Sequence, residues 1–215
     1  MSWSSGKDSA MALAAARRDP TVEVTALFCT LNAQADRVAM HAVRHSLLEA
    51  QADRLGLPLV AVQIPSPCPN EIYEARMAEA MAAAREQGVT RVVFGDLFLA
   101  DVRAYREDNL ARSGLKPLFP LWLRPTDALA REMIEEGLKA VITCVDPAQL
   151  GRKFAGRRFD AELLAQLPAG VDPCGENGEF HTFVHAGPVC SAPIACIRGE
   201  TVERDGFVFC DLIEA

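Results

Sequence analysis

Ser4-Ser5-Gly6-Lys7-Asp8-Ser9 stands directly before a run of small apolar residues, 10–16, near the start of this 215-residue chain. Small residues allow a tight turn, and both Asp8 and Ser9 are common helix caps. Backbone N–H groups at a helix start are unpaired and attract an anion, and Lys7 would add a positive charge beside them. The stretch predicts either a phosphate-binding loop or an ordinary helix N-cap, and its spacing alone does not decide between the two.

The composition is that of an ordinary globular protein, with 50% hydrophobic and 24% charged residues. The chain is long enough for one large domain, or for a main domain with a smaller one. A formal net charge of -7 argues against a protein that holds nucleic acid through its phosphates. Because no apolar run is long enough to span a membrane and the N-terminus lacks the charged and apolar regions of a signal peptide, we expect a cytoplasmic protein.

The 7 cysteines form no Cys-x-x-Cys pair. This spacing argues against a zinc ribbon, a thioredoxin-like motif and a simple disulfide framework. Cysteines in apolar runs are expected to be small buried hydrophobes.

Helices and strands alternate along the first two thirds of the chain. Apolar periodicity and Gly or Pro stops predict helices over 8–18, 40–55, 71–87, 100–113 and 126–136, and strands over 22–31, 59–64, 91–94 and 139–145. The segment 116–123 contains two prolines, so we expect a packed connector there. The alternation predicts an α/β fold with a doubly wound parallel sheet in residues 1–146.

The sequence pattern changes in residues 147–215, and it predicts a small C-terminal α+β portion that binds the substrate. A short helix is expected over 160–167, and two strands over 194–198 and 207–212 flank a hairpin turn at Asp205-Gly206.

Polar loops follow several of the predicted strands. Ligands collect at the carboxyl ends of parallel strands, where the loops 4–9, 32–37 and 65–70 and the pair Gly95-Asp96 are expected to meet. Met1-Ser2-Trp3 is too short for a full strand ahead of the first loop. We therefore expect a stunted first strand or a natural start upstream, with weak bracing of the loop and low activity.

The opening loop lacks the spacing of a Walker loop and resembles the PP-loop, usually Ser-Gly-Gly-x-Asp-Ser, of the ATP pyrophosphatases. Ser5 stands where glycine is usual, which we expect to be tolerated if its φ stays negative. Three later segments narrow the resemblance: Val93-Phe94-Gly95-Asp96-Leu97 with Tyr105-Arg106-Glu107, then Pro120-Leu121-Trp122, then Cys174-Gly175-Glu176-Asn177-Gly178-Glu179-Phe180-His181-Thr182-Phe183. In this order they are similar to the diphthine-ammonia ligase family of PP-loop proteins, in a bacterial-type subgroup, over nearly the whole chain.

This resemblance implies an adenine nucleotide alpha hydrolase-like fold, with ATP and Mg²⁺ as cofactors. It implies a ligase that adenylates a carboxylate, releases pyrophosphate and forms an amide with ammonia or an amine. Asn177 stands where glycine is common and His181 where glutamate is common. We interpret these departures as a sign of a smaller carboxylate acceptor than diphthine.

Site roles follow from the resemblance and from position. Catalysis is assigned to Lys7, Asp8 and Glu179, and a Mg²⁺ contact to Asp8. Nucleotide binding is assigned to Ser4, Ser5, Gly6, Lys7, Asp8, Ser9, Gly95 and Asp96. Substrate binding is assigned to His41, Glu107, Glu176, Gly178, Glu179, His181 and Thr182.

Ordinary structural roles are open for several of these residues. Asp96 also suits a helix N-cap, and Glu107 also suits a surface ion pair with Arg103. His181 and Thr182 alternate on a strand, so only one of them is expected to face the cleft.

Two other functions compete with the ligase. One is a non-catalytic ATP- or AMP-binding module, and the other is a PP-loop tRNA-modifying enzyme, which the acidic charge and the missing Cys-x-x-Cys pair argue against. The expected partners are ATP, a carboxylate on a small molecule or a modified protein side chain, and ammonia or an amine. A homodimer is possible, and neither nucleic acid nor a membrane is an expected partner.

Overall fold

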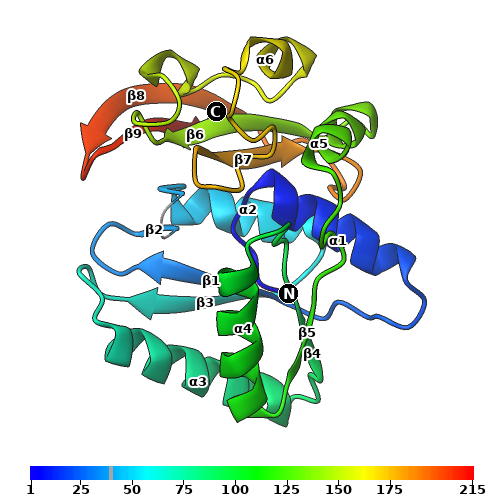
Figure 1. The fold of residues 1–215 in the computed structure, drawn as a ribbon. Helices are drawn as coiled ribbons and strands as arrows, with labels where there is room; N and C mark the ends of the chain where they lie inside the picture. Colours follow the sequence, from blue (N-terminus) through cyan, green and yellow to red (C-terminus); the bar gives the residue numbers. More distant parts are fainter. Residues whose placement is uncertain (39–40) are drawn as a thin grey trace.

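The computed structural model describes residues 1–38 and 41–215 and has two halves stacked on one another (Figure 1). The lower half holds the parallel strands, and the upper half holds a four-stranded antiparallel sheet. The helices are α1 (Lys7–Arg18), α2 (His45–Leu55), α3 (Asn70–Glu86), α4 (Ala100–Ser113), α5 (Thr126–Glu135) and α6 (Ala161–Gln166), with a 3-10 turn at Arg152–Phe154. The strands are β1 (Leu27–Asn32), β2 (Arg37–Val38), β3 (Leu59–Ile64), β4 (Arg91–Val93), β5 (Lys116–Leu118), β6 (Lys139–Val145), β7 (Phe180–Ala186), β8 (Cys196–Arg204) and β9 (Phe207–Glu214).

Two parallel strand pairs make the lower half an α/β fold. β1 pairs with β3 over six residues, and β4 pairs with β5 over three. The first three residues lie between these pairs: Ser2 forms a parallel bridge to Phe28, and its N–H donates to the carbonyl of Val93 at 2.9 Å. Short as it is, this segment connects β1 to β4 and leads directly into the loop at Ser4.

Helices cover both faces of this parallel region. α1 and α2 lie toward the antiparallel sheet, and α3 and α4 lie on the opposite side (Figure 1). A large core cluster joins α1 and α2 to the upper half, whereas a small cluster around Met81, Phe94 and Leu110 lies under α3 and α4. Gly56 and Gly114 end α2 and α4 in the left-handed conformation, as the glycine positions predict.

The strand over 139–145 was expected in the parallel sheet, and this assignment was wrong. β6 is antiparallel to both β7 and β9, in a sheet with the order β7-β6-β9-β8. The strands of this sheet therefore come from both sides of residue 146, where the sequence predicts a division between two portions. The predicted hairpin at Asp205-Gly206 is confirmed, because β8 and β9 pair on either side of it.

Other segments also differ from the sequence predictions, among them the strand expected over 194–198, which is β8 at Cys196–Arg204. The segment 116–118 is a strand rather than a connector, and Pro117 is accommodated because β5 pairs on one side only, with β4. β1 begins at Leu27 rather than at residue 22. α2 begins at His45, and the expected start at Met40 lies outside the described residues.

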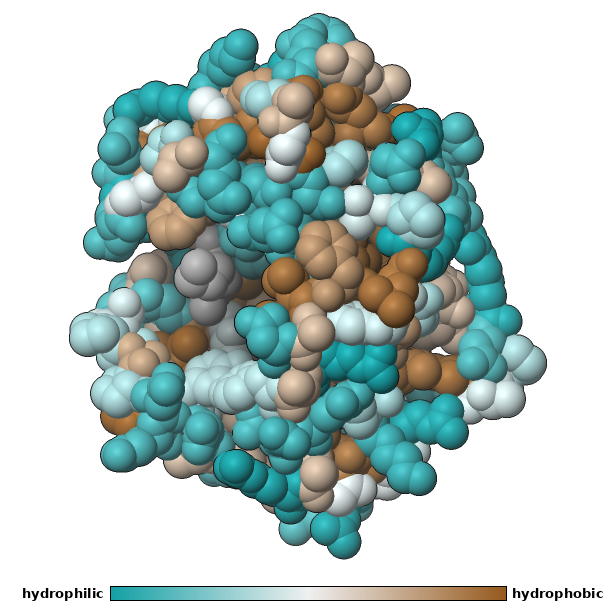
Figure 2. Space-filling model, viewed as in Figure 1, coloured by the Kyte–Doolittle hydropathy of each residue, from teal (hydrophilic) through white to brown (hydrophobic). Residues whose placement is uncertain are grey.

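Hydrophilic residues cover most of the face seen in Figure 2, and hydrophobic side chains show through near its middle and in its upper part. Within residues 1–38 and 41–215, no helix combines the length and apolar character needed to cross a bilayer.

Candidate active site

The loop Ser4–Ser9 connects the first three residues to α1. Gly6 occupies the N-cap position of α1 with extended backbone (φ -92°, ψ 173°) and no side-chain cap. The expectation that Asp8 or Ser9 caps this helix was wrong. Ser9 instead closes the loop, because its Oγ accepts from the Ser4 N–H at 3.2 Å and lies 2.8 Å from Ser4 Oγ. The start of the helix is left free of a competing side-chain acceptor from its own cap residue.

Ser5 adopts a left-handed backbone conformation, with φ +70°. The sequence-based expectation of a negative φ was wrong, and Ser5 has the geometry that glycine adopts without strain. Its side chain is fully buried, and its Oγ has no hydrogen-bond partner among the described residues. An orphaned hydroxyl in a strained loop is the type of group that an anionic ligand would satisfy.

Ser5→Gly is expected to raise the free energy of unfolding by about 1 kcal/mol, because glycine relieves the left-handed strain of this position. The measurement is urea unfolding followed by circular dichroism. Ser46→Gly, in the first turn of α2, is the matched control, because its helical backbone carries no left-handed strain, and it should destabilise by a few tenths of a kcal/mol. If Ser5→Gly destabilises as much as the control, Ser5 is not strained.

Two glycines permit close packing around the loop. A Cβ on Gly95 would lie 2.9 Å from both the carbonyl carbon of Asp8 and the nitrogen of Ser9. A Cβ on Gly6 would lie 3.2 Å from the carbonyl oxygen of Thr182. The loop is thus held between the end of β4 and strand β7, so the two halves of the chain meet at this point.

Lys7 is buried between the two halves, with 2% of its side chain exposed. Its Nζ donates to the Asp8 carboxylate at 2.8 and 3.0 Å and to the carbonyl of Cys174. The ammonium also lies 5.3 Å from the ring centre of Phe180 and 5.6 Å from that of Phe159. Burial acts most strongly and lowers the pKa of Lys7, but the charge and hydrogen bond of Asp8, together with the nearby Cys174 and Glu176, outweigh it, so the pKa is raised and the ammonium persists.

Asp8 is the more open member of this pair, with 27% of its side chain exposed. Burial raises the pKa of Asp8, and the Lys7 ammonium opposes this effect. No cluster of three or more His, Cys, Asp or Glu side chains suited to a metal ion occurs in the described residues. Mg²⁺ usually takes one or two carboxylates together with phosphate oxygens, so Asp8 suits such a contact.

Glu176 reaches from the upper half to the loop after β4. Its Oε1 accepts from the N–H of Leu97 at 2.7 Å and from that of Phe98 at 3.3 Å. Burial raises the pKa of Glu176 to about 7, and the nearby Asp8 carboxylate acts in the same direction. A carboxyl group with this pKa can accept or release a proton near neutral pH.

Glu179 is turned into its own loop and is 1% exposed. Its Oε1 accepts from the Asp172 N–H at 2.9 Å and from Asn177 Nδ2 at 3.0 Å, and its Oε2 accepts from the Asn177 N–H at 2.9 Å. Gly178 completes the turn with φ +86°. This geometry suits a carboxylate that fixes the turn and thereby places Glu176.

Thr182, His181 and His41 lie on the other side of the loop. Thr182 Oγ1 accepts from the Lys7 N–H at 3.1 Å, and the rings of His181 and His41 are 4.5 Å apart. Burial lowers the pKa of His181 to about 4 and that of His41 well below its usual value, so both rings are neutral at pH 7.

The carboxylates of Asp96 and Glu107 each form an ion pair with an arginine of α4. Asp96 forms a two-pronged ion pair with Arg106, at 2.7 and 3.0 Å, and Leu99 rather than Asp96 is the N-cap residue of α4. Glu107 is 44% exposed and pairs with Arg103 at 2.7 Å, one helical turn away. Glu107 therefore forms the surface ion pair that its sequence position also allowed, and the structure does not bring it to the loop.

Gln51 was missed by the sequence predictions. Its Nε2 donates to the carbonyls of Ser5 at 3.0 Å and Val184 at 2.6 Å, and its Oε1 accepts from Trp3 Nε1 at 2.8 Å. The available signal is its helical spacing, since Gln51 follows Leu47 by four residues on the buried face of α2.

Comparisons with known proteins cover both halves of the chain. The N-terminal domain of diphthamide synthase matches residues 1–117, and the C-terminal domain matches residues 125–211. A diphthine–ammonia ligase of Danio rerio is 30% identical over 184 residues, covering 78% of this chain and 71% of that protein. A diphthine–ammonia ligase of Homo sapiens is 28% identical over 192 residues, covering 81% of this chain and 71% of that protein.

Proposed function

We propose, from the premise that this chain belongs to the diphthamide synthase family, that it is an ATP-dependent ligase which forms a carbon–nitrogen bond. The structural observation that carries the proposal is the loop Ser4–Ser9, packed against Gly95 on one side and Thr182 on the other. The names of the relatives specify diphthine and ammonia as their substrates. A carboxylate and ammonia are accordingly the reactants proposed for this chain.

The loop fits the phosphates of ATP by its shape and by its donors. Ser5 presents a buried hydroxyl without a hydrogen-bond partner in residues 1–38 and 41–215, and the start of α1 supplies backbone N–H groups and the positive end of a helix dipole. ATP, cleaved between its α and β phosphates, would activate the carboxylate for attack by ammonia. Donors at the loop would stabilise the negative charge that grows on the departing pyrophosphate.

Lys7 and Asp8 act together in this proposal. Asp8 keeps the Lys7 ammonium charged, and its partly exposed carboxylate is the proposed contact for Mg²⁺. Gly95 allows the backbone of Asp8 to approach the end of β4. The segment between β1 and β4, with helices on both faces, supports the finer proposal of a doubly wound sheet with its ligand site at the strand ends.

Glu176 is the proposed proton acceptor for ammonia, and Glu179 is a positioning residue. Glu176 has a pKa near neutrality and lies within the electrostatic influence of Asp8. Glu179 holds the turn that carries Glu176, through three hydrogen bonds. Thr182 accepts from the Lys7 N–H, His181 packs against His41, and the acceptor is proposed to bind between this turn and the loop.

The test incubates the protein with Mg-ATP, ammonium and either diphthine or a panel of smaller carboxylates, and mass spectrometry follows the nucleotide and amide products. We expect AMP, pyrophosphate and amide in equal amounts, with formation dependent on both the carboxylate and ammonium. ADP and phosphate as products would contradict the proposal. AMP binding without turnover on any carboxylate would favour a non-catalytic nucleotide-binding module.

The pH dependence of stability provides a test of Glu176. In the folded protein its proton is held up to about pH 7, whereas in the unfolded chain it is released near pH 4.5. Between these values the unfolded state binds fewer protons, so this group lowers the free energy of unfolding as the pH rises from about 4.5 to about 7. Glu176→Gln should therefore gain stability relative to the wild type over this range. A difference between the two proteins that stays constant with pH would exclude a raised pKa.

A further inference from the structure

Strand β8 forms an uncovered edge of the antiparallel sheet, next to β9 and farthest from β7 (Figure 1). At the opposite edge, the loop Ser4–Ser9 covers β7, because the N–H of Val184 donates to the carbonyl of Ser5 at 3.0 Å. In residues 1–38 and 41–215, no segment besides β9 forms backbone hydrogen bonds with β8. Residues 200–204 of β8 are all exposed. An exposed edge of this length can act as a template for another strand.

The turn between β8 and β9 fixes which backbone groups of β8 point outward. Asp205-Gly206 is a two-residue turn with positive φ at both positions, +53° and +83°, as a type I′ hairpin requires. The two residues that flank such a turn form a hydrogen-bonded pair, so alternation makes Val202 the next residue bonded to β9. The N–H and C=O groups of Thr201 and Glu203 consequently point away from β9 and can pair with a further strand.

Exposed apolar side chains lie along the same edge. Ile197 is 56% exposed and lies opposite Ile213 of β9, which is 37% exposed. Val202 is 39% exposed and lies opposite Phe209. Since residues 209 and 213 lie an even number of positions apart on β9, all four side chains share one face of the sheet. Covering such side chains with a second apolar surface is favourable by about 25 cal/mol per Å².

The charges of β8 complement those of a second β8 in one antiparallel register. With a two-fold axis at Val202, Glu200 of each copy lies opposite Arg204 of the other. An axis at Glu203 would place two glutamates opposite each other, and an axis at residue 201 would place two arginines opposite each other. Like charges in directly opposite positions destabilise a strand pair. Charge therefore selects the axis at Val202, which also brings the outward backbone groups of residues 201 and 203 together.

We propose that β8 pairs with β8 of a second copy of this chain, antiparallel about a two-fold axis at Val202, and joins the two four-stranded sheets into one. Thr201 exchanges backbone hydrogen bonds with Glu203 of the second copy, and the symmetry repeats this pair. Val202 packs on itself at the axis, between two Glu200–Arg204 pairs. In the described part of the chain Glu200 has no ion pair, and Arg204 has one only with the adjacent Asp205, at 4.0 Å. Dimer formation thus breaks no strong contact of the single chain.

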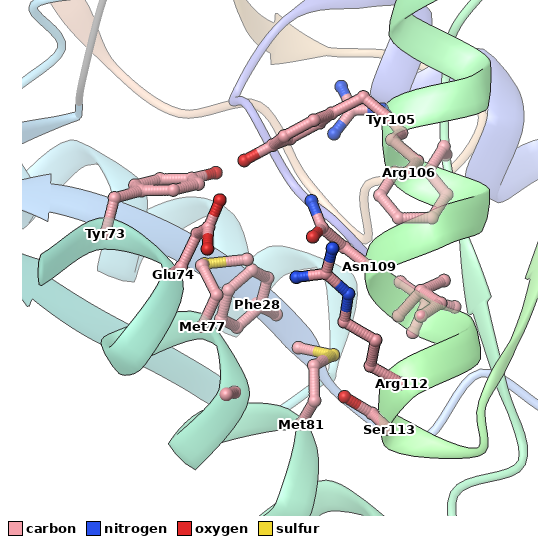
Figure 3. A pocket seen from close by; sticks show the side chains of 14 residues that line it. Phe28, Tyr73, Glu74, Met77, Met81, Tyr105, Arg106, Asn109, Arg112 and Ser113 are labelled. Atoms are coloured by element: carbon pink, nitrogen blue, oxygen red, sulfur yellow. The ribbon is translucent and has the colours of Figure 1, made fainter. Parts of the chain in front are cut away.

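Pairing at β8 leaves the loop Ser4–Ser9 and the pocket between α3 and α4 open in each copy. The loop contacts β7, at the other edge of the sheet. The pocket, shown in Figure 3, is lined by residues of the parallel half and by none of β6–β9. The dimer therefore has no need to rearrange either feature.

Sedimentation velocity of the full chain over a range of concentrations measures the dimer and its Kd. A single strand pair is a small interface, so we expect a reversible dimer with a Kd in the micromolar range. Glu200→Arg replaces both ion pairs by pairs of arginines and should raise the Kd about tenfold. Adding Arg204→Glu exchanges the two charges and should restore the wild-type Kd. Glu23→Arg, an exposed charge reversal outside the sheet, is the matched control and should leave the Kd unchanged.

Thr201 provides the test of backbone pairing. Thr201→Pro removes an N–H that bonds the second copy and none that bonds β9, so the dimer should be lost while circular dichroism shows a folded monomer. Thr201→Val keeps this N–H and should keep the dimer; if Thr201→Pro is unfolded, the charge exchange decides alone. The proposal is overturned if the wild type is a monomer at every concentration, if Glu200→Arg or folded Thr201→Pro dimerises as the wild type does, or if the charge exchange fails to restore the dimer.

Discussion

Gly95→Ala is expected to lower the rate of AMP formation by about 100-fold, since an error of about 1 Å in a catalytic loop has an effect of that size. The added Cβ would lie 2.9 Å from backbone atoms of Asp8 and Ser9, and neither contact can be relieved by rotating a side chain. The loop must move away from the end of β4. The measurement is the initial rate of AMP release with saturating Mg-ATP and the carboxylate that supports turnover.

Gly151→Ala is the matched control for this change. Gly151 has φ -59°, and a Cβ there would meet no atom of the described residues within 4 Å, so the rate of the variant should equal that of the wild type. A Gly95→Ala protein with the wild-type rate would show that contact between this glycine and the loop does not position the site.

Asp8→Asn is expected to affect both stability and catalysis. It removes the charge that neutralises the buried Lys7 ammonium, and breaking such a pair costs about 3–5 kcal/mol in the free energy of unfolding. It also removes the proposed Mg²⁺ contact, so AMP formation should fall by at least about 10- to 100-fold. Urea unfolding and the rate of AMP release measure the two effects.

The double variant Lys7→Met with Asp8→Asn separates these two effects. Replacing both partners of a buried ion pair is often neutral for stability, so the double variant should recover most of the lost stability. Its rate of AMP formation should stay low, because neither charged group is restored. Recovery of activity together with stability would show that the pair is structural only, and full turnover by Asp8→Asn alone would refute the role of the loop.

The sequence contained enough information for the family and for the alternation of elements. The family assignment is confirmed by matches to both halves of the chain, and it was predictable because the family's motifs are contiguous runs in a fixed order. The loop, most helices and the hairpin were predictable because they depend on residues that are close in the sequence. The partners of β6 could not be predicted. An apolar run such as Lys139–Val145 is typical of any strand buried on both faces, and its antiparallel neighbours come much later in the chain.

The start of α2 could not be predicted from the sequence for a similar reason. Apolar spacing continues upstream of His45, but Arg37 and Arg44 are both held by Asp211 of β9, at 2.7 and 2.6 Å. Contacts between residues so far apart override a local helical pattern, and a single sequence carries no signal for them.

The sequence predicted which residues lie near the loop more reliably than the direction in which their side chains point. The loop, Gly95, Glu176 and Thr182 come together because they lie at strand or helix ends that the fold brings to one place. The direction of a side chain depends on its nearest donors, as the burial of Glu179 among the amides of its own turn illustrates. The catalytic and binding roles of these residues stay proposals, to be tested by the variants above.

The most direct test of the central proposal follows an oxygen isotope from the acceptor carboxylate. The acceptor that supports turnover is labelled with ¹⁸O in its carboxylate and incubated with the protein, Mg-ATP and ammonium, and the products are analysed by mass spectrometry. Activation by transfer of AMP predicts that one labelled oxygen appears in AMP and none in pyrophosphate. Label in inorganic phosphate with ADP as the nucleotide product, or AMP without label, would contradict it.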